Sequence, residues 1–284
     1  MEPRTAVACA RARMPVLWLG LALIIAKLVA GDHLGAPWPE VLTALGGTVF
    51  VVGMALYLRI GTVRGEPVPL DAPVSGRWLA LNSPAGKVPS HGVHAYGQTY
   101  ALDVVHDPTD RPRPAFGWWP PARRAEHFPA FGRPVLAPAD GTVVRVHDRE
   151  RDHWSRNSWL ALPYLLVEAS LRELLGPGRI LGNHLVIDIG DGRYVVMAHL
   201  RRRSVRVAAG DPVIAGQRLA SCGNSGNSTE PHLHFQVMDH PRILFAAGLP
   251  FRFSRYRTDD GVRGGVPRGG QAFIAPSGVD SAAG

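Results

Sequence analysis

The stretch that most constrains the fold is Ser221–Asp239, in which a Gly/Asn/Ser turn leads through Pro231 into a short strand carrying His232 and His234. Residues two apart in a strand point to the same face, so both imidazoles face one way and the apolar residues between and after them face the other. Two such histidines can share a metal ion, or one can bind metal while the other transfers protons. The alternative is a pair of surface histidines on an edge strand. A third ligand elsewhere in the chain decides between the two.

A carboxylate that could be the third metal ligand lies upstream. Asp103 stands inside the apolar run YALDVV, where a lone carboxylate is costly unless it is paired or bound to a metal. A strand-end aspartate that caps a turn is the alternative. His91 and His94, in the loop PSHGVHAYGQ, are close enough in sequence to fold back beside Asp103. Either His91 or His94 can therefore lie beside Asp103.

A further histidine follows a later apolar run. VVMAHL is predicted to place His199 on the same strand face as Val195 and Met197, where a lone histidine usually belongs to the core. Two neutral imidazoles and one carboxylate would leave a zinc ion an open fourth position for water, whose pKa zinc lowers to about 7. The remaining histidines could take the proton, then stabilise an oxyanion or protonate a leaving amine.

After residue 77, short β-like runs alternate with turn residues, which is typical of a mainly antiparallel β domain. We expect this domain to span residues 78–256, after a Pro-rich linker at 65–77. Beyond Tyr256 the chain is rich in Gly, Asp and Arg, which predicts a disordered tail at 257–284.

An insertion at residues 154–177 breaks this pattern. Ser158–Leu175 is predicted to be a helix that ends at the following Gly-Pro pair. The favoured arrangement packs this helix on the sheet. The alternative lays it on a membrane surface with nearby tryptophans and arginines at headgroup depth, and the FGWWPP loop at 116–121 suits the same role or lines a groove.

The first 64 residues contain two apolar runs, at about 14–30 and 41–58, which predict a hairpin of two membrane helices. A signal peptide is the alternative for the first run. Arginines before the first run and after the second would place both ends in the cytoplasm by the positive-inside rule.

The formal charge of +8 comes almost wholly from arginine, since Lys27 and Lys87 are the only lysines. Such a charge suits an acidic polymer, an anionic membrane surface or nucleic acid. No nucleic-acid-binding motif accompanies it, so no nucleic-acid partner is expected. Cys9 and Cys222 lie far apart and predict neither a disulfide framework nor a cysteine-based zinc site.

Three stretches carry a family resemblance: GNHLVIDIGDGRYVVMAHL, VRVAAGDPVIAGQRLASCGNSGNST and EPHLHFQV. Together they resemble the M23 family of zinc metallopeptidases, the lysostaphin/LytM-type peptidoglycan endopeptidases, over about Trp78 to Asp239. The resemblance implies a β-sheet groove with zinc at its floor and cleavage of peptide bonds in bacterial cell-wall peptides. Carried over by position, it implies Asp103 and His234 as zinc ligands, and His199 and His232 as the catalytic histidines.

The chain departs from the family at the first ligand, because the usual histidine four residues before the aspartate is Thr99 here. The preceding loop is expected to supply it, with His91 as first choice and His94 as second. The GNSGNST turn is expected at the groove edge, where the amides of Asn224 and Ser225 contact substrate.

The sequence thus predicts a membrane-anchored zinc endopeptidase that acts on peptidoglycan peptides. Its domain would face the cell wall from the bacterial membrane, against the positive-inside rule, since large domains can cross despite their charge. The alternative is a catalytically inactive module that binds cell wall or activates another hydrolase. Retention of Asp103 and of three histidines at matching positions favours the enzyme.

Overall fold

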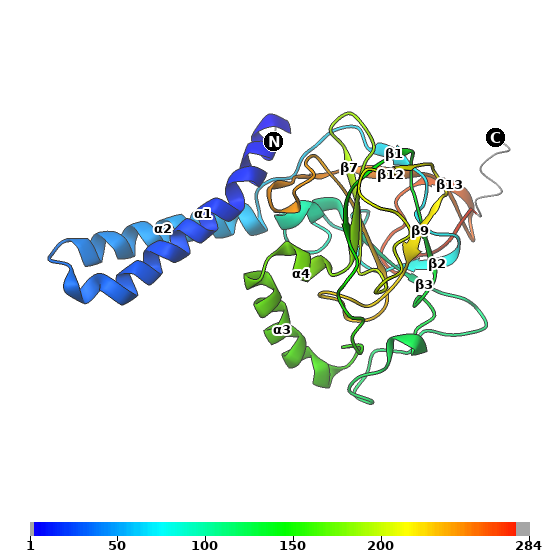
Figure 1. Cartoon of the computed structure of the whole chain (residues 1–284), viewed down its shortest axis with the longest axis horizontal. Coiled ribbons are helices and arrows are strands. Elements are labelled where there is room, and N and C mark those ends of the chain that lie inside the picture. The colour runs from blue at the N-terminus through cyan, green and yellow to red at the C-terminus, as the bar shows by residue number, and fades with distance from the viewer. Residues whose placement is uncertain (1–2, 277–284) are drawn as a thin grey trace.

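The computed structural model describes residues 3–276. Two helices, α1 (Pro3–Ala30) and α2 (Trp38–Leu58), form a hairpin that projects from one side of a β domain (Figure 1). Both are long and apolar enough to cross a membrane, by length and composition. They contain the two apolar runs that the sequence predicts as membrane helices.

Glycines let the two helices approach each other closely. A Cβ on Gly53 would lie 2.7 Å from the Cα of Leu17, and one on Gly20 would lie 2.4 Å from the backbone nitrogen of Phe50. Small residues at such contacts are typical of membrane helix pairs. A larger side chain at either glycine would force the helices apart.

The first half of α1 does not project but docks on the β domain. Met14 is buried in a cluster with residues of the domain. The Arg13 guanidinium donates to the carbonyl oxygen of Leu56 at 3.0 Å and also to that of His94. The hairpin and the β domain therefore share a packed junction.

Within the described residues, twelve strands form one mixed, largely antiparallel sheet, and two more form a small second sheet. The main path runs β1 (Val68–Leu70), β12 (Phe251–Thr258), β14 (Ala272–Ala275), β2 (Gly76–Ala80), β3 (Leu102–His106), β10 (Leu233–Met238), β7 (Tyr194–Ala198), β6 (His184–Asp188), β5 (Gly141–His147) and β8 (Pro212–Val213). Off this path, β11 (Gly248–Leu249) pairs with β10 and β13 (Gly261–Gly265) with β12, while β4 (Pro134–Leu136) pairs with β9 (Arg218–Ser221). The predicted antiparallel β domain is confirmed.

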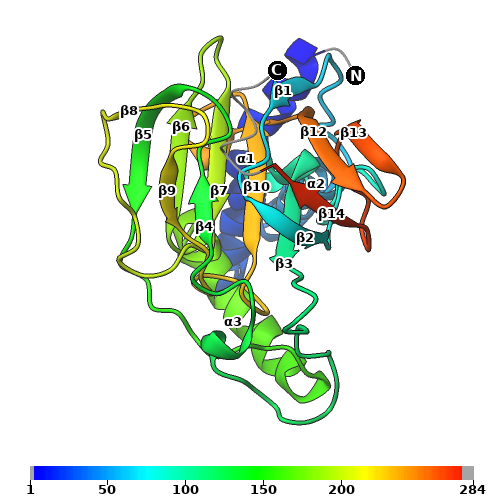
Figure 2. The same ribbon diagram turned by 90° about the vertical axis from the view of Figure 1, so that its right-hand side faces the viewer.

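Strand β10 lies at the centre of this sheet and is buried along its whole length (Figure 2). Its apolar residues Leu233, Phe235 and Val237 enter the main core, as the alternation in the sequence predicts. Met238, on the opposite face, belongs to a second cluster that includes Met14 of α1. The two-faced strand thus packs on one side and presents His234 on the other.

The predicted disordered tail is wrong over residues 257–276, and the part at 277–284 lies outside the described residues. Strand β14 pairs with β2 and β12, and Phe273 is buried with its ring centroid 5.7 Å from that of Tyr256. The predicted linker also joins the sheet, because β1 pairs with β12. These strands are formed by short apolar runs within Gly- and Pro-rich sequence. The average composition of the segments does not reveal such short runs.

The insertion contains a 3-10 turn (Trp159–Ala161), α3 (Leu162–Leu174) and α4 (Pro177–Leu181). Pro177 begins α4, since proline suits the first turn of a helix. None of the residues of α3 is buried. The favoured prediction, a helix packed on the sheet, is therefore wrong.

Stability should fall in mild acid because His184 is buried as the neutral form. Burial, with smaller contributions from His147 and Arg145, lowers the pKa of His184 to about 4, below its ordinary value of 6.5. The unfolded chain therefore takes up the proton first, and the free energy of unfolding should fall by about 3 kcal/mol as pH drops from 6.5 to 4. The melting temperature should depend on pH less steeply across this range for His184→Gln than for the wild type, and as steeply as in the wild type for exposed His127→Gln. Equal slopes for both variants would contradict this assignment.

Candidate metal centre

Strand register brings the predicted site residues together. His234 lies opposite Asp103 on β3 and opposite Ala198 on β7. His199 follows Ala198 directly, and His232 directly precedes β10. Four side chains from three neighbouring strands therefore converge at the end of β10.

Asp103 is the centre of this group. Its Oδ1 lies 2.9 Å from His234 Nδ1, and its Oδ2 lies 2.8 Å from His91 Nε2. One ligand atom from each of these three residues lies within 4.8 Å of the others. Asn82 donates to Oδ2 at 2.8 Å and holds the carboxylate in place.

The hydrogen bonds of His234 show that this group fits a metal cation. Gln236 donates through Nε2 to the carbonyl oxygen of Tyr96 at 2.8 Å, which turns its Oε1 toward His234 Nε2 at 2.9 Å. That oxygen only accepts, so Nε2 carries the proton and a neutral His234 presents a bare lone pair at Nδ1. In this tautomer the lone pair faces an oxygen of Asp103 at 2.9 Å, and either a second proton on His234 or a metal cation beside the two acceptors satisfies the contact. Two imidazole nitrogens and a carboxylate form a donor set that suits zinc.

Electrostatics favour the ionised carboxylate. Burial raises the pKa of Asp103, but electrostatic interaction with His91 and His232 and hydrogen bonding with His234 and His91 outweigh the effect of burial. The pKa of Asp103 is therefore held well below its ordinary value. The same partnership raises the pKa of His91 despite its burial.

His94, the second candidate for the first ligand, points away from this group. Its Nδ1 lies 3.1 Å from Thr99 Oγ1, and its backbone N–H donates to the carbonyl oxygen of Tyr57 at 2.8 Å. Burial and the charge of Arg13 lower the pKa of His94 to about 4. His94 thus belongs to the junction with the hairpin, as does Thr99.

His199 and His232 lie side by side, with ring centroids 4.7 Å apart. The Nδ1 of His199 is 2.9 Å from the carbonyl oxygen of Ser225, and that of His232 is 2.8 Å from the carbonyl oxygen of Glu230. Each Nδ1 therefore carries the proton, and each Nε2 is left to accept one. Burial and the charges of His232 and His234 hold the pKa of His199 well below its ordinary value, so His199 is neutral at pH 7.

The backbone at His199 differs from the prediction. Strand β7 ends at Ala198, and His199 has φ 59°, in the left-handed region. Strand alternation with Met197 therefore does not set its direction. Backbone bonds from His199 to the carbonyl oxygen of Leu181 and from Leu200 to that of Asn183 hold this conformation, and non-glycine residues in it are concentrated at functional sites.

The predicted substrate contacts at Asn224 and Ser225 are wrong for this conformation, because both residues are fully buried. The backbone N–H of Asn224 donates to Asp152, and the Ser225 hydroxyl donates to the carbonyl oxygen of Leu200. Ser225 instead orients His199 through its carbonyl oxygen. The turn therefore orients a site histidine rather than contacting substrate.

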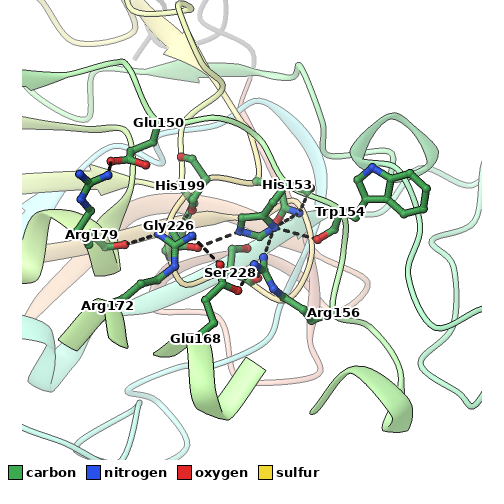
Figure 3. A network of polar contacts seen from close by, with 12 residues as sticks. Glu150, His153, Trp154, Arg156, Glu168, Arg172, Arg179, His199, Gly226 and Ser228 are labelled. Atoms are coloured by element: carbon green, nitrogen blue, oxygen red, sulfur yellow. Dashed lines mark hydrogen bonds and ion pairs between the residues drawn. The ribbon is translucent and has the colours of Figure 1, made fainter. Parts of the chain in front are cut away.

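A buried polar network, which the sequence does not reveal, links the insertion to this turn (Figure 3). His153 Nε2 donates to the carbonyl oxygen of Gly226 at 2.9 Å. Arg156 bonds to His153 and pairs with Glu168 of α3. Ser228, at the other end of the turn, lies 3.0 Å from His232 Nδ1. The insertion therefore braces the segment that orients both paired histidines.

Gln236 was also not predicted, although its place two residues after His234 on the same strand face is a usable signal. Replacing Gln236 by leucine should weaken metal binding about 10- to 100-fold, because outer partners of a ligating histidine set its tautomer and orientation. Competition with a fluorescent zinc chelator measures this. Gln271→Leu, at an exposed turn, is the matched control, and equal affinity for the two variants would contradict the role of Gln236.

A His/Asp/His group at a β-sheet, beside two further histidines, is a class of site that suits a metallopeptidase. Residues 169–244 match the family model described as peptidase family M23. Over this segment the chain is similar to peptidase family M23.

The chain is also similar to individual proteins. The chain is 30% identical over 135 residues to an uncharacterized metalloprotease of Haemophilus influenzae, an alignment covering 48% of this chain and 22% of that protein. It is similar to a zinc-containing peptidase of Vibrio cholerae at 22% identity, covering 64% of this chain and 37% of the other with a TM-score of 0.31. The catalytic domain of lysostaphin, an antimicrobial peptidase of Staphylococcus simulans, gives 21% identity, 61% and 88% coverage, and a TM-score of 0.31. The chain thus spans about a fifth of the length of the curated relative that it matches.

Proposed function

We propose that this chain is a membrane-anchored zinc metalloendopeptidase that hydrolyses peptide bonds of bacterial peptidoglycan. The observation that carries the proposal is the convergence of His234 Nδ1 and His91 Nε2 on the two oxygens of the ionised Asp103. Two imidazole nitrogens and a carboxylate so placed are a donor set that suits zinc.

His91, Asp103 and His234 would hold the zinc ion. When bound, zinc supplies Lewis acidity and lowers the pKa of a water molecule to about 7. His199 and His232 each present an Nε2 that can accept a proton, and their Nδ1 protons are fixed on backbone carbonyls. One of them would take the proton from the attacking water at its Nε2, and the imidazolium so formed would stabilise the developing oxyanion before it passes that proton to the leaving amine.

The substrate class rests on the similarity to peptidase family M23 and on charge. Members of the family that the sequence resembles cleave peptides of the cell wall. The net charge of +8 suits a polymer that carries carboxylates, as peptidoglycan peptides do. The bond within those peptides depends on the loops around the groove.

The anchoring rests on the hairpin. The docked first half of α1 and the β domain lie together at one end of the hairpin, so both belong on the same side of a membrane that the projecting part crosses (Figure 1). A cell-wall substrate requires that side to be the outer one. Protease added to intact spheroplasts should therefore digest the β domain, and protection until lysis would contradict this orientation.

Digestion of defined muropeptides by the purified full chain, with mass spectrometric readout, tests the activity. We expect cleavage of a peptide bond, its loss with a chelator and its return with zinc. Cleavage of casein but of no muropeptide would overturn the substrate class. Absence of any cleavage from fully zinc-loaded protein would favour the inactive binding module instead.

A further inference from the structure

Helix α3 turns its charged side chains toward the domain and its apolar side chains outward. The side chains of Glu168 and Arg172 turn inward, where Glu168 pairs with Arg156 and also with Arg172 at 2.9 Å. The large apolar residues of the same helix are exposed: Tyr164, Leu166, Val167, Leu171 and Leu174, followed by Leu175. A helix on a soluble surface presents the opposite pattern. An apolar face of this length on the outside requires a partner.

The apolar surface continues into the FGWWPP loop. Trp159, at the start of the helical segment, contacts Phe116 and Trp118 with ring centroids 4.9 and 6.1 Å away. The backbone of the loop is tied to the same place, since the N–H of Trp159 donates to the carbonyl oxygen of Gly117 at 3.0 Å. Trp119 is 78% exposed. Loop and helix therefore form one surface, here called the insertion face: Phe116, Trp118, Trp119, Trp159, Leu160, Tyr164, Leu166, Val167, Leu171, Leu174 and Leu175.

The insertion face begins where the hairpin leaves the domain. Glu173, near the end of α3, accepts hydrogen bonds from Tyr57 in the last turn of α2, at 3.2 Å, and from Tyr96 of the domain. In Figure 1 the hairpin projects from the same side of the domain on which α3 lies, and α3 runs across the direction of the hairpin. The end of α3 that carries Glu173 therefore adjoins the base of the hairpin.

The border of this surface has the residues of a lipid headgroup zone. Arg151 and Trp154 line one cavity of about 510 Å³ together with Leu160 and Tyr164 of the insertion face. Arginine beside tryptophan and tyrosine at the edge of an apolar surface is typical of protein at a membrane interface.

We propose that the insertion face lies on the lipid bilayer beside the hairpin, as a second and interfacial membrane contact of the chain. This inference rests on the proposed membrane anchoring. In this contact α3 would lie in the plane of the membrane interface. The polar network of Glu168, Arg156 and His153 would connect α3 to the turn that orients His199 (Figure 3).

The contact is tested with one fluorescent label per chain. The full chain is placed in lipid nanodiscs, with empty discs in excess so that a disc holds a single chain. In a Cys9→Ser background, where Cys222 is fully buried, an environment-sensitive fluorophore is placed at Leu171→Cys on the insertion face. Leu174→Cys is a second position in case the first impairs folding. Val262→Cys, 71% exposed on β13, is the matched control, and Val51→Cys in α2, 66% exposed, reports the hairpin. Acyl-chain spin-labelled lipids serve as quenchers.

We expect quenching at Leu171→Cys and Val51→Cys and none at Val262→Cys. Quenching at Val51→Cys without quenching at Leu171→Cys would overturn the contact and leave the anchoring intact. Lack of quenching at all positions would overturn the anchoring and the contact with it, without bearing on peptidase activity. A blue-shifted but unquenched label at Leu171→Cys would indicate a protein partner such as a second copy, and would also overturn the bilayer contact.

Discussion

Replacing Asp103 by alanine should remove bound zinc and reduce peptide cleavage to background. The carboxylate is the shared acceptor of His91 and His234, and it is the only anion that faces them among the described residues of the site. Without it, two imidazoles remain of the three protein ligands that a catalytic zinc site uses. Asp103→Asn tests the charge alone, because it keeps the shape of the side chain and removes the anion.

Zinc content after dialysis, measured by atomic absorption beside muropeptide cleavage, checks this expectation. Asp107→Ala is the matched control: it lies just after the same strand and pairs with Arg77 at 3.4 Å, away from the histidines. We expect the control to keep both zinc and activity. Wild-type zinc content in Asp103→Ala would place the metal elsewhere.

The second large predicted effect distinguishes His91 from His94 as the first zinc ligand. We expect His91→Ala to lose zinc and activity, because its Nε2 is the nitrogen 2.8 Å from Asp103. His94→Ala should keep its zinc and lose stability instead, by about 1 to 3 kcal/mol, because Thr99 Oγ1 is left without its buried partner.

Zinc content and thermal melting of the two variants should therefore change in opposite ways. His91 is half-buried and His94 fully buried, so a loss of zinc in His91→Ala without a large loss of stability would identify a ligand rather than a packing residue. Retention of zinc in His91→Ala together with its loss in His94→Ala would overturn the choice.

The sequence predicts the β core and the convergence on Asp103 because both depend on local patterns. Period-two alternation places Leu233 and Phe235 in the core, and a carboxylate within an apolar strand must be paired. The direction of His199 could not be predicted, since its left-handed backbone is imposed by bonds to distant segments.

Other features depend on tertiary contacts that composition conceals. His91 and His94 are equally near Asp103 in sequence, and only the junction with α1 turns His94 away. Of the strands after residue 257, β13 is held by pairing with β12, and β14 by pairing with β2 and β12, rather than by their own propensity. The reversed polarity of α3 follows from the buried pairing of Glu168 with Arg156, which no pattern within the helix reveals.

Zinc titration into the metal-free full chain, with muropeptide cleavage followed in the same sample, tests most directly whether this chain is a zinc peptidase built on His91, Asp103 and His234. Cleavage should rise from background and level off at about one zinc per chain, as expected for a single three-ligand centre. Full zinc occupancy without cleavage, or cleavage that persists after the metal is removed, would contradict it.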